Sequence, residues 1–197
     1  MSLPPAYFDG LYAKSSDPWG LADRVYEARK YAMTLSALPR THYKRAFEPG
    51  CSIGVLSRLL STRVEHLVAS DSSIAALEAA RMHDQPKNIE FLHGTVPGEW
   101  PEGAFDLIVF SELGYYFDPI DLDRFIERAR GSLEPAGQLI AVHWRPDVLE
   151  YPSNAYEVHS RLHQASVFIP LAHYEDAHFL LDVFGATNSA MLIGPED

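Results

Sequence analysis

Paired cysteines and long apolar runs are both missing from this 197-residue chain, which has a single cysteine. One thiol excludes an intramolecular disulfide framework and is typical of a reducing, cytoplasmic setting. No uninterrupted apolar stretch approaches the roughly 20 residues that a membrane-spanning helix needs. Residues 1–17 carry charges where a signal peptide would have its apolar core. We therefore expect a cytoplasmic protein with no membrane partner.

Positive charge is also scarce. Lys and Arg together number 16 against 27 Asp and Glu, the net charge is −11, and no basic run occurs. A nucleic-acid partner needs a clustered positive face, so we expect none. The 47% hydrophobic and 12% aromatic content excludes a disordered chain, and the length suits one domain with a substantial core. The oligomeric state does not follow from the sequence.

A glycine-containing loop between two apolar segments is the most informative motif. Residues 46–54 read AFEPGCSIG, and the segment that follows has helical spacing. This order of strand, tight turn and helix is the first half of a nucleotide-binding βαβ unit. Gly50 and Gly54 allow a sharp turn and a close backbone approach to a ligand. Asp71 ends the next apolar run, 17 residues after Gly54, where an acid can accept hydrogen bonds from ribose hydroxyls.

The loop departs from the dinucleotide fingerprint, which disfavours an NAD-dependent oxidoreductase. It has G-x-x-x-G spacing, and Glu48 precedes the first glycine by two residues. A pyrophosphate needs an open anion site at the helix N-terminus, whereas a carboxylate attracts a cationic ligand without phosphate. The loop resembles motif I of the class I S-adenosylmethionine-dependent methyltransferases, E/D-x-G-x-G-x-G, with Ser52 in place of the middle glycine. The resemblance implies S-adenosyl-L-methionine as cofactor and S-adenosyl-L-homocysteine as product.

Apolar runs and helical periodicities alternate along the chain as far as residue 144. We expect strands at residues 44–48, 66–71, 89–93, 105–110 and 138–144, with intervening helices at 54–60, from 72 or 73 onward, and at 118–133. A further helix is expected at 154–163. The runs 167–173 and 178–184 are so closely joined that they must pair as an antiparallel hairpin. This order predicts an α/β, Rossmann-like class I methyltransferase fold, with a seven-stranded, mostly parallel sheet, an antiparallel C-terminal hairpin and helices on both faces.

The two ends of the chain frame a single domain. Residues 21–38 are expected to form one helix, and residues 135–137 a turn. The apolar face expected for that helix consists of Leu21, Val25, Ala28, Ala32 and Leu35. We expect residues 1–40 to form an N-terminal helical lid or cap, residues 41–186 a single Rossmann-like methyltransferase domain, and residues 187–197 a loosely ordered C-terminal tail.

Longer matches narrow the resemblance. The segments EPGC (residues 48–51), FDLIVFSE (105–112) and YY (115–116), together with DPW (17–19) and YExR (26–29), are similar to the NodS-type branch of these methyltransferases. The resemblance extends to about residue 184. Members near nodulation genes N-methylate the free amine of a chitooligosaccharide, and others act on unassigned small substrates. The resemblance implies methyl transfer by in-line displacement to a small-molecule acceptor, with an amine, including an amino sugar, as the first expectation.

Few catalytic residues are expected, because methyl transfer from a sulfonium needs alignment and water exclusion more than acid–base groups. Glu112 follows the fourth strand, and we expect it either to contact the methionine amine or to accept from a substrate amine. Its alternative is a loop acid in solvent. His143 ends the fifth strand and is a candidate general base, or else a core histidine. Tyr115 is a candidate wall of the methyl pocket, or plain core.

Several residues are expected at the cofactor, most of them in loops that follow strands. Arg29 could hold the methionine carboxylate or be a solvated helix residue, and Trp19 is a lid candidate. Thr95 stands where many relatives have an acid that bonds the adenine amino group. Cys51 is interpreted as a small buried filler and not as a nucleophile. The expected cofactor-binding residues are Glu48, Gly50, Cys51, Ser52, Gly54, Asp71, Ser72, Thr95, Val96, Ser111, Arg29 and Trp19.

Two other functions stay open. His143 would serve a hydroxyl as well as an amine, which makes a small-molecule O-methyltransferase the first alternative. A cofactor-binding domain without turnover is the second. A metal site is not expected. His159 and His163 stand at i and i+4, but neither an H-E-x-x-H motif nor a cysteine pair accompanies them, so a surface helix with two histidines is the interpretation.

Overall fold

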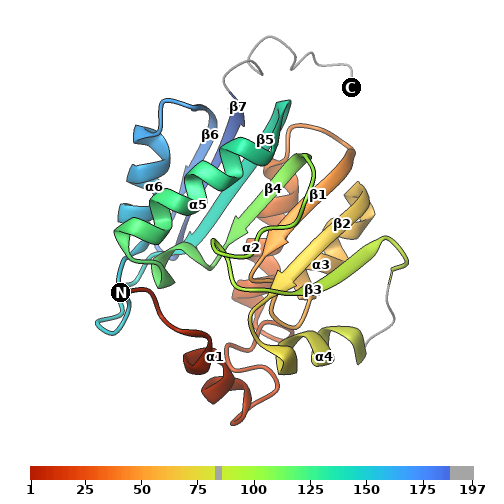
Figure 1. Ribbon diagram of the computed structural model, residues 1–197, viewed down its shortest axis with the longest axis vertical. Coiled ribbons are helices and arrows are strands. Elements are labelled where there is room, and N and C mark those ends of the chain that lie inside the picture. The colour runs from red at the N-terminus through yellow and green to blue at the C-terminus, as the bar shows by residue number, and fades with distance from the viewer. Residues whose placement is uncertain (83–85, 187–197) are drawn as a thin grey trace.

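The computed structural model describes residues 1–82 and 86–186 of the chain, and its centre is a seven-stranded sheet (Figure 1). The strand order is β3-β2-β1-β4-β5-β7-β6, with β7 antiparallel to both of its neighbours and the other pairs parallel. The expected sheet with a C-terminal hairpin is confirmed. The strands are β1 (Tyr43–Pro49), β2 (Val64–Asp71), β3 (Ile89–His93), β4 (Phe105–Ser111), β5 (Leu133–Trp144), β6 (Phe168–Glu175) and β7 (Phe179–Ala186).

Helices cover both faces of the sheet. Buried residues of α5 and α6 pack on one face, and those of α2, α3 and α4 pack on the other (Figure 1). Two short 3-10 turns complete the described elements. The helices are α1 (Pro5–Tyr12), α2 (Val25–Ala37), α3 (Val55–Leu60), α4 (Ile74–Met82), α5 (Pro119–Ser132) and α6 (Ala155–Gln164), and the turns are η1 (Ser61–Arg63) and η2 (Gly114–Tyr116). In the described part of the chain, no helix is long and apolar enough to cross a membrane.

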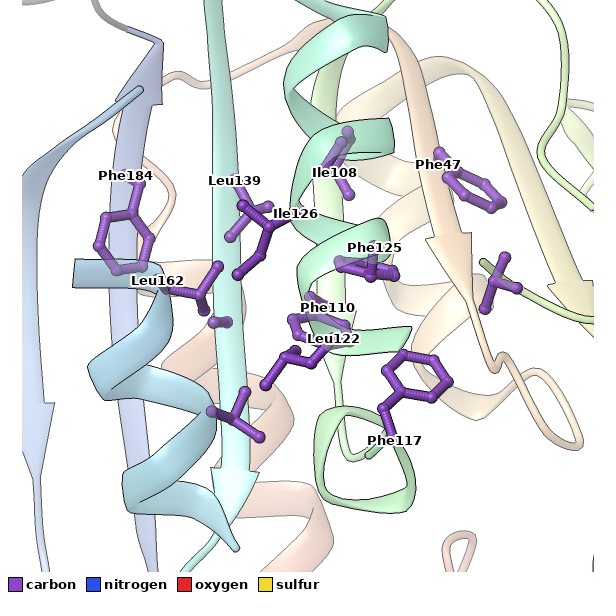
Figure 2. Packing of buried hydrophobic residues seen from close by; sticks show 14 of the residues in the cluster. Phe47, Ile108, Phe110, Phe117, Leu122, Phe125, Ile126, Leu139, Leu162 and Phe184 are labelled. Atoms are coloured by element: carbon purple, nitrogen blue, oxygen red, sulfur yellow. The ribbon is translucent and has the colours of Figure 1, made fainter. Parts of the chain in front are cut away.

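The central strand β4 and helix α5 form the core that positions the site. Phe110 of β4 stacks on Phe125 of α5, with 3.9 Å between ring centroids (Figure 2). The next buried ring, Phe117, stacks on Phe110 at 6.3 Å. Asp118 caps α5, because its side chain accepts from two backbone N–H groups at 2.9 and 3.0 Å and Pro119 occupies the first turn. This packing fixes the turn between β4 and α5 at one edge of the sheet.

The helix expected at residues 21–38 is shorter, and it buries a different face. It begins at Val25, which is 85% exposed. Ala28 and Ala32 are also exposed, so the expected apolar face was wrong. The physical reason is that this helix packs through charged and hydroxyl side chains that satisfy one another. The buried side chains of α2 are those of Glu27, Lys30, Tyr31 and Thr34.

Strand β5 is longer than expected and includes residues 135–137, which were predicted to be a turn. It pairs with β4 first through Phe105 and Leu133 and then through Leu107 and Gln138. The register shifts between these pairs, since β5 advances five residues while β4 advances two, and residues 135–137 stay within the strand. Residues 187–197, expected as a tail, lie outside the described residues.

Candidate active site

A cavity opens at the carboxyl ends of β1, β2 and β4, the edge at which open α/β sheets bind ligands. Loops that follow the strands build one wall, through residues 50–52, 71–72, 94–96 and 111–113. The N-terminal segment supplies further lining from α1, α2 and the chain between them. In Figure 1, α1 lies beyond the carboxyl ends of these strands. The parallel strands therefore bring four loops to one space bordered by the N-terminal segment.

The loop after β1 has a backbone conformation that accounts for its sequence. Ser52 has φ 51°, in the left-handed region, and this is where motif I carries a glycine. Its hydroxyl is 2.5 Å from the hydroxyl of Tyr12 in α1, a hydrogen bond between the two walls. Gly54 has φ 71° and does not line the cavity. A Cβ at this position would instead meet Ala80 and Phe91 at 3.2 Å. Gly54 therefore permits close packing between α3, α4 and β3, which differs from its expected role at the ligand.

Asp71 ends β2 with a carboxylate that two backbone groups orient. It accepts from the N–H of Ser52 at 2.8 Å and from the N–H of Ser73 at 2.9 Å, one on each oxygen. Each oxygen keeps a further lone pair, and Asp71 lines the cavity beside Ser72. Burial raises the pKa of Asp71, while the N–H groups act in the opposite direction. The carboxylate is therefore placed to accept bonds from ligand hydroxyls such as those of a ribose.

Glu48 supplies a second buried carboxyl group to the cavity. Its side chain accepts a hydrogen bond from the Ser57 hydroxyl at 2.5 Å, and the residue is 3% exposed. Burial raises the pKa of Glu48 to about 8, although the bond from Ser57 opposes the shift. Such a group is largely neutral at pH 7 and ionises when a cation approaches, because an opposite charge stabilises the carboxylate. The environment of Glu48 therefore favours a ligand with a positive group.

A buried ion-pair network that sequence reasoning missed lies beside these carboxyl groups. The ammonium Nζ of Lys30 is 2.8 Å from Glu27 Oε2 and 3.0 Å from Glu112 Oε1, and Lys30 is 1% exposed. Nζ also lies 4.9 Å from the ring centroid of Tyr26. The hydroxyl of Tyr115 donates to the second oxygen of Glu112 at 2.5 Å. The helix was predicted from the spacing of apolar residues, which gives no information about buried charged residues such as Lys30. Only the YExR motif (residues 26–29) indicated that this part of α2 is functional.

The backbone of Glu112 is strained in a way that helps to aim its side chain. Glu112 has φ 55°, the left-handed region, which costs a non-glycine residue roughly 1–3 kcal/mol. Its N–H donates to the carbonyl of Val142 at 2.8 Å, which extends the pairing of β4 and β5. With Lys30 and Tyr115 on its two oxygens, the Glu112 carboxylate has a fixed position at the cavity.

Comparison with known proteins agrees with this geometry. Residues 46–137 match the profile of the methyltransferase domain family. A Pseudomonas syringae protein provisionally assigned as a methyltransferase is 44% identical and superposes with a TM-score of 0.73, over 82% of this chain and 99% of its own. The chain belongs to the class I S-adenosylmethionine-dependent methyltransferases. Its cofactor is S-adenosyl-L-methionine.

Two NodS proteins are among the relatives to which this methyltransferase is similar. Nodulation protein S of Rhizobium tropici is 28% identical over 129 residues, which are 64% of this chain. The match spans about half, 54%, of the length of that relative. The N-methyltransferase NodS of Bradyrhizobium japonicum WM9, solved in complex with S-adenosyl-L-homocysteine, shares the fold. It has a TM-score of 0.81 at 20% identity, over 92% of this chain and 97% of NodS.

Ten of the twelve residues expected at the cofactor line the cavity of this methyltransferase. They are Trp19, Glu48, Gly50, Cys51, Ser52, Asp71, Ser72, Thr95, Val96 and Ser111. The donor set fits S-adenosylmethionine, since Asp71 offers free lone pairs to hydroxyls and Glu48 offers a carboxyl to a cationic end. The N–H of Thr95 donates to Glu99 Oε2 at 2.7 Å, so an acid lies next to the position where relatives carry one. Burial raises the pKa of the Cys51 thiol, which agrees with a filler and not a nucleophile.

Arg29 is not placed at the cofactor, where the sequence led us to expect it. The guanidinium of Arg29 lies 2.6 Å from Asp176 Oδ2 and donates to the hydroxyl of Tyr174 at 2.7 Å, so it ties α2 to the C-terminal hairpin and does not line the cavity. The Arg29 side chain points away from the cavity, whereas the next residue, Lys30, lines it. This geometry does not support the contact with the methionine carboxylate, whereas the alternative, a solvated helix residue, agrees with a side chain that is 44% exposed.

His143 is fully buried behind the site and does not line the cavity. Its Nε2 accepts from the N–H of Gly114 at 3.0 Å, and its Nδ1 is 3.1 Å from Nε2 of His159. Burial lowers the pKa of His143 well below its usual value, and His159 adds to the shift. With both ring nitrogens engaged, His143 supports the η2 turn and is not placed to act as the expected general base.

Aromatic rings form the wall beyond Glu112. Tyr115 stacks on Tyr151 with 5.4 Å between centroids, and Tyr116 meets Tyr151 edge-on at 4.8 Å. Phe8 of α1 packs edge-on against Tyr116 at 5.0 Å. All four rings line the cavity. Aromatic faces attract cationic groups such as a sulfonium methyl or an ammonium, so this wall suits a reaction in which positive charge moves between two partners.

Proposed function

We propose that this methyltransferase transfers its methyl group to the nitrogen of a small amine, with Glu112 as the residue that receives the amine. The position of the Glu112 carboxylate carries the proposal, because Glu112 lines the same cavity as Asp71 and the aromatic wall. Lys30 and Tyr115 hold its two oxygens at 3.0 and 2.5 Å. A carboxylate accepts N–H bonds and attracts an amine more strongly than a neutral hydroxyl.

The mechanism needs an unprotonated nitrogen aligned with the sulfonium methyl, and the cofactor supplies that methyl group. Glu112 accepts an N–H of the acceptor and directs the nitrogen lone pair away from itself, toward the cofactor end. The methylated nitrogen then carries an extra proton, which Glu112 or solvent takes up. We assign the ribose contact to Asp71, and we assign the closing of the site to residues 1–40, whose Tyr12 and Trp19 already border the cavity.

The setting of the reaction follows from the charge of the chain. The net charge of −11 repels a nucleic acid and suits a cationic small molecule. The single cysteine supports a cytoplasmic setting.

An amino sugar is one acceptor in this class, in line with the NodS relatives. An O-methyltransferase is less well supported, because the base expected for it, His143, does not line the cavity.

Release of S-adenosylhomocysteine during turnover tests the acceptor class. The protein is incubated with S-adenosylmethionine and matched pairs of compounds, each pair differing only in an amino or a hydroxyl group, with glucosamine and glucose as one pair. We expect product above the no-acceptor rate with amines, rising with pH as the amine loses its proton. Product with hydroxyl compounds and none with their amines would contradict the proposal.

A pair of variants tests the assigned roles. Glu112→Gln keeps the shape but removes the charge, and we expect kcat to fall about 10²-fold or more with a small change in the Kd of S-adenosylhomocysteine. For Asp71→Asn we expect the reverse, a Kd raised about 10-fold or more with less effect on kcat at saturating cofactor. If Glu112→Gln instead weakened cofactor binding as strongly as Asp71→Asn, Glu112 would belong to the cofactor end.

A further inference from the structure

A group of imidazole and carboxylate side chains gathers outside the cavity, where α6 covers the C-terminal hairpin (Figure 1). Asp182 Oδ1 is 2.8 Å from Nδ1 of His173 and 3.1 Å from Nε2 of His163. One ligand atom from each of the three residues lies within 4.8 Å of the others. None of the three lines the cavity of the proposed active site.

The fold brings these residues together for a simple reason. His173 on β6 and Asp182 on β7 are direct cross-strand partners, so their side chains lie on the same face of the sheet. Helix α6 packs on this face, and His163 stands in its last turn. The ring of His163 meets Phe184, also on β7, edge-on at 5.0 Å. Three separate elements thus hold the three side chains.

The group has the features of a built site. Asp182 is fully buried, while the side chains of His163 and His173 are 39% and 54% exposed, so the two imidazole rings reach from solvent to a buried carboxylate. The second oxygen of Asp182 is 2.5 Å from Nδ1 of His159, which orients the carboxylate from behind. The second nitrogen of His173 faces Glu175 Oε2 at 3.9 Å. In metal sites, carboxylates and imidazoles that contact the ligands in this way, without contacting the metal, orient those ligands.

We propose that His163, His173 and Asp182 bind a transition-metal dication of the Zn²⁺ type, which joins α6 to the β6–β7 hairpin. Two imidazole nitrogens and one carboxylate oxygen are a common three-ligand set for Zn²⁺, and a water molecule completes the tetrahedron. Two nitrogens among three ligands disfavour Mg²⁺ and Ca²⁺, which prefer oxygen. The pair His159 and His163, adjacent on one helix turn, does not form the site, because His159 turns inward to His143 and Asp182.

Calorimetric titration of the metal-free, tag-free full chain with ZnCl₂ tests the site. We expect saturable binding of one Zn²⁺ per chain, and a rise in Tm when Zn²⁺ is present. His163→Ala and His173→Ala are expected to weaken binding at least 10-fold each. The control is His66→Ala, because His66 is also half-exposed and lies 3.3 Å from an acid, Glu90, on another part of the sheet.

The variants remove exposed side chains, so circular dichroism should show that each remains folded. Co²⁺ provides a second readout, because a tetrahedral site gives visible absorption bands that His173→Ala should abolish and His66→Ala should keep. Absence of saturable Zn²⁺ binding in the wild-type chain would overturn the proposal and leave a purely hydrogen-bonded cluster. Equal losses in His66→Ala and His173→Ala would overturn it too, since they would indicate non-specific binding.

Discussion

Replacement of Lys30 by methionine is the sharpest single test of the buried network beside the cavity. The ammonium lies 2.8 Å from Glu27 and 3.0 Å from Glu112, and Lys30 is 1% exposed. The side chains of Glu27 and Glu112 are themselves only 7% and 23% exposed. Methionine has a similar length and no charge, so Lys30→Met leaves two carboxylates near one another with little water and no cation.

The expected loss of folding stability in Lys30→Met comes mainly from leaving the buried carboxylates without a cation, and not from the lost ion-pair attraction alone. Removing one member of a buried ion pair destabilises a protein by about 3–5 kcal/mol, because the remaining charge stays buried without compensation. In a domain of this size, each kcal/mol changes Tm by about 2–4 °C. We therefore expect Lys30→Met to lower Tm by roughly 6–20 °C.

Differential scanning calorimetry at pH 7 measures the effect, with two further variants as controls. Glu27→Gln combined with Lys30→Met removes one of the two unpaired charges and should recover a large part of the loss. Arg29→Met removes the neighbouring cation, whose partner Asp176 lies on the exposed hairpin, and should change Tm far less. A fall below 2 °C for Lys30→Met, or no recovery in the double variant, would refute the argument that the pairing of Lys30 is essential.

Two further predictions concern a carboxyl group and a glycine near the loop after β1. The pKa of Glu48 is about 8 in the folded chain against about 4.3 when unfolded, so its contribution to stability is present below about pH 4.3 and is lost as pH rises toward 8. Measured by urea denaturation, the free energy of unfolding of Glu48→Gln relative to that of the wild-type chain should therefore rise by on the order of 3–5 kcal/mol as the pH increases from 4 to 9. Gly54→Ala should lose about 1–3 kcal/mol, because φ is 71° and the new Cβ meets Ala80 at 3.2 Å, whereas Gly10→Ala in α1, with open space around it, should be neutral or gain up to about 1 kcal/mol.

Opposite results would be informative in both cases. If the stability difference between Glu48→Gln and the wild-type chain did not change with pH, the Glu48 carboxyl would not be held neutral by burial. If Gly54→Ala and Gly10→Ala behaved alike, the close packing of α3 against α4 would not depend on the missing Cβ.

The fold, and most of the cavity wall that the loops after the strands form, could be predicted from local patterns. Apolar runs of strand length, helical periodicity and the hairpin after residue 165 determine the order of elements, and parallel strands put their carboxyl ends at one edge. The glycine loop and Asp71 therefore had to meet, and they do, through the bond from the N–H of Ser52. The register shift in β5 was not predictable, because it depends on the pairing with the neighbouring strand β4.

The sequence by itself determined which strands, which loop and which cofactor this protein has, because these depend on residues close together in the chain. Only the tertiary structure decided the partners of the charged groups. Lys30 faces Glu112 across 82 positions of sequence, Arg29 turns to Asp176, and His143 turns to His159. The physical reason is that a helix or strand can present a polar side chain to solvent, to a cavity or to a buried partner. Packing against distant elements decides which of these three environments a side chain meets, and the periodicity of the sequence does not contain that information.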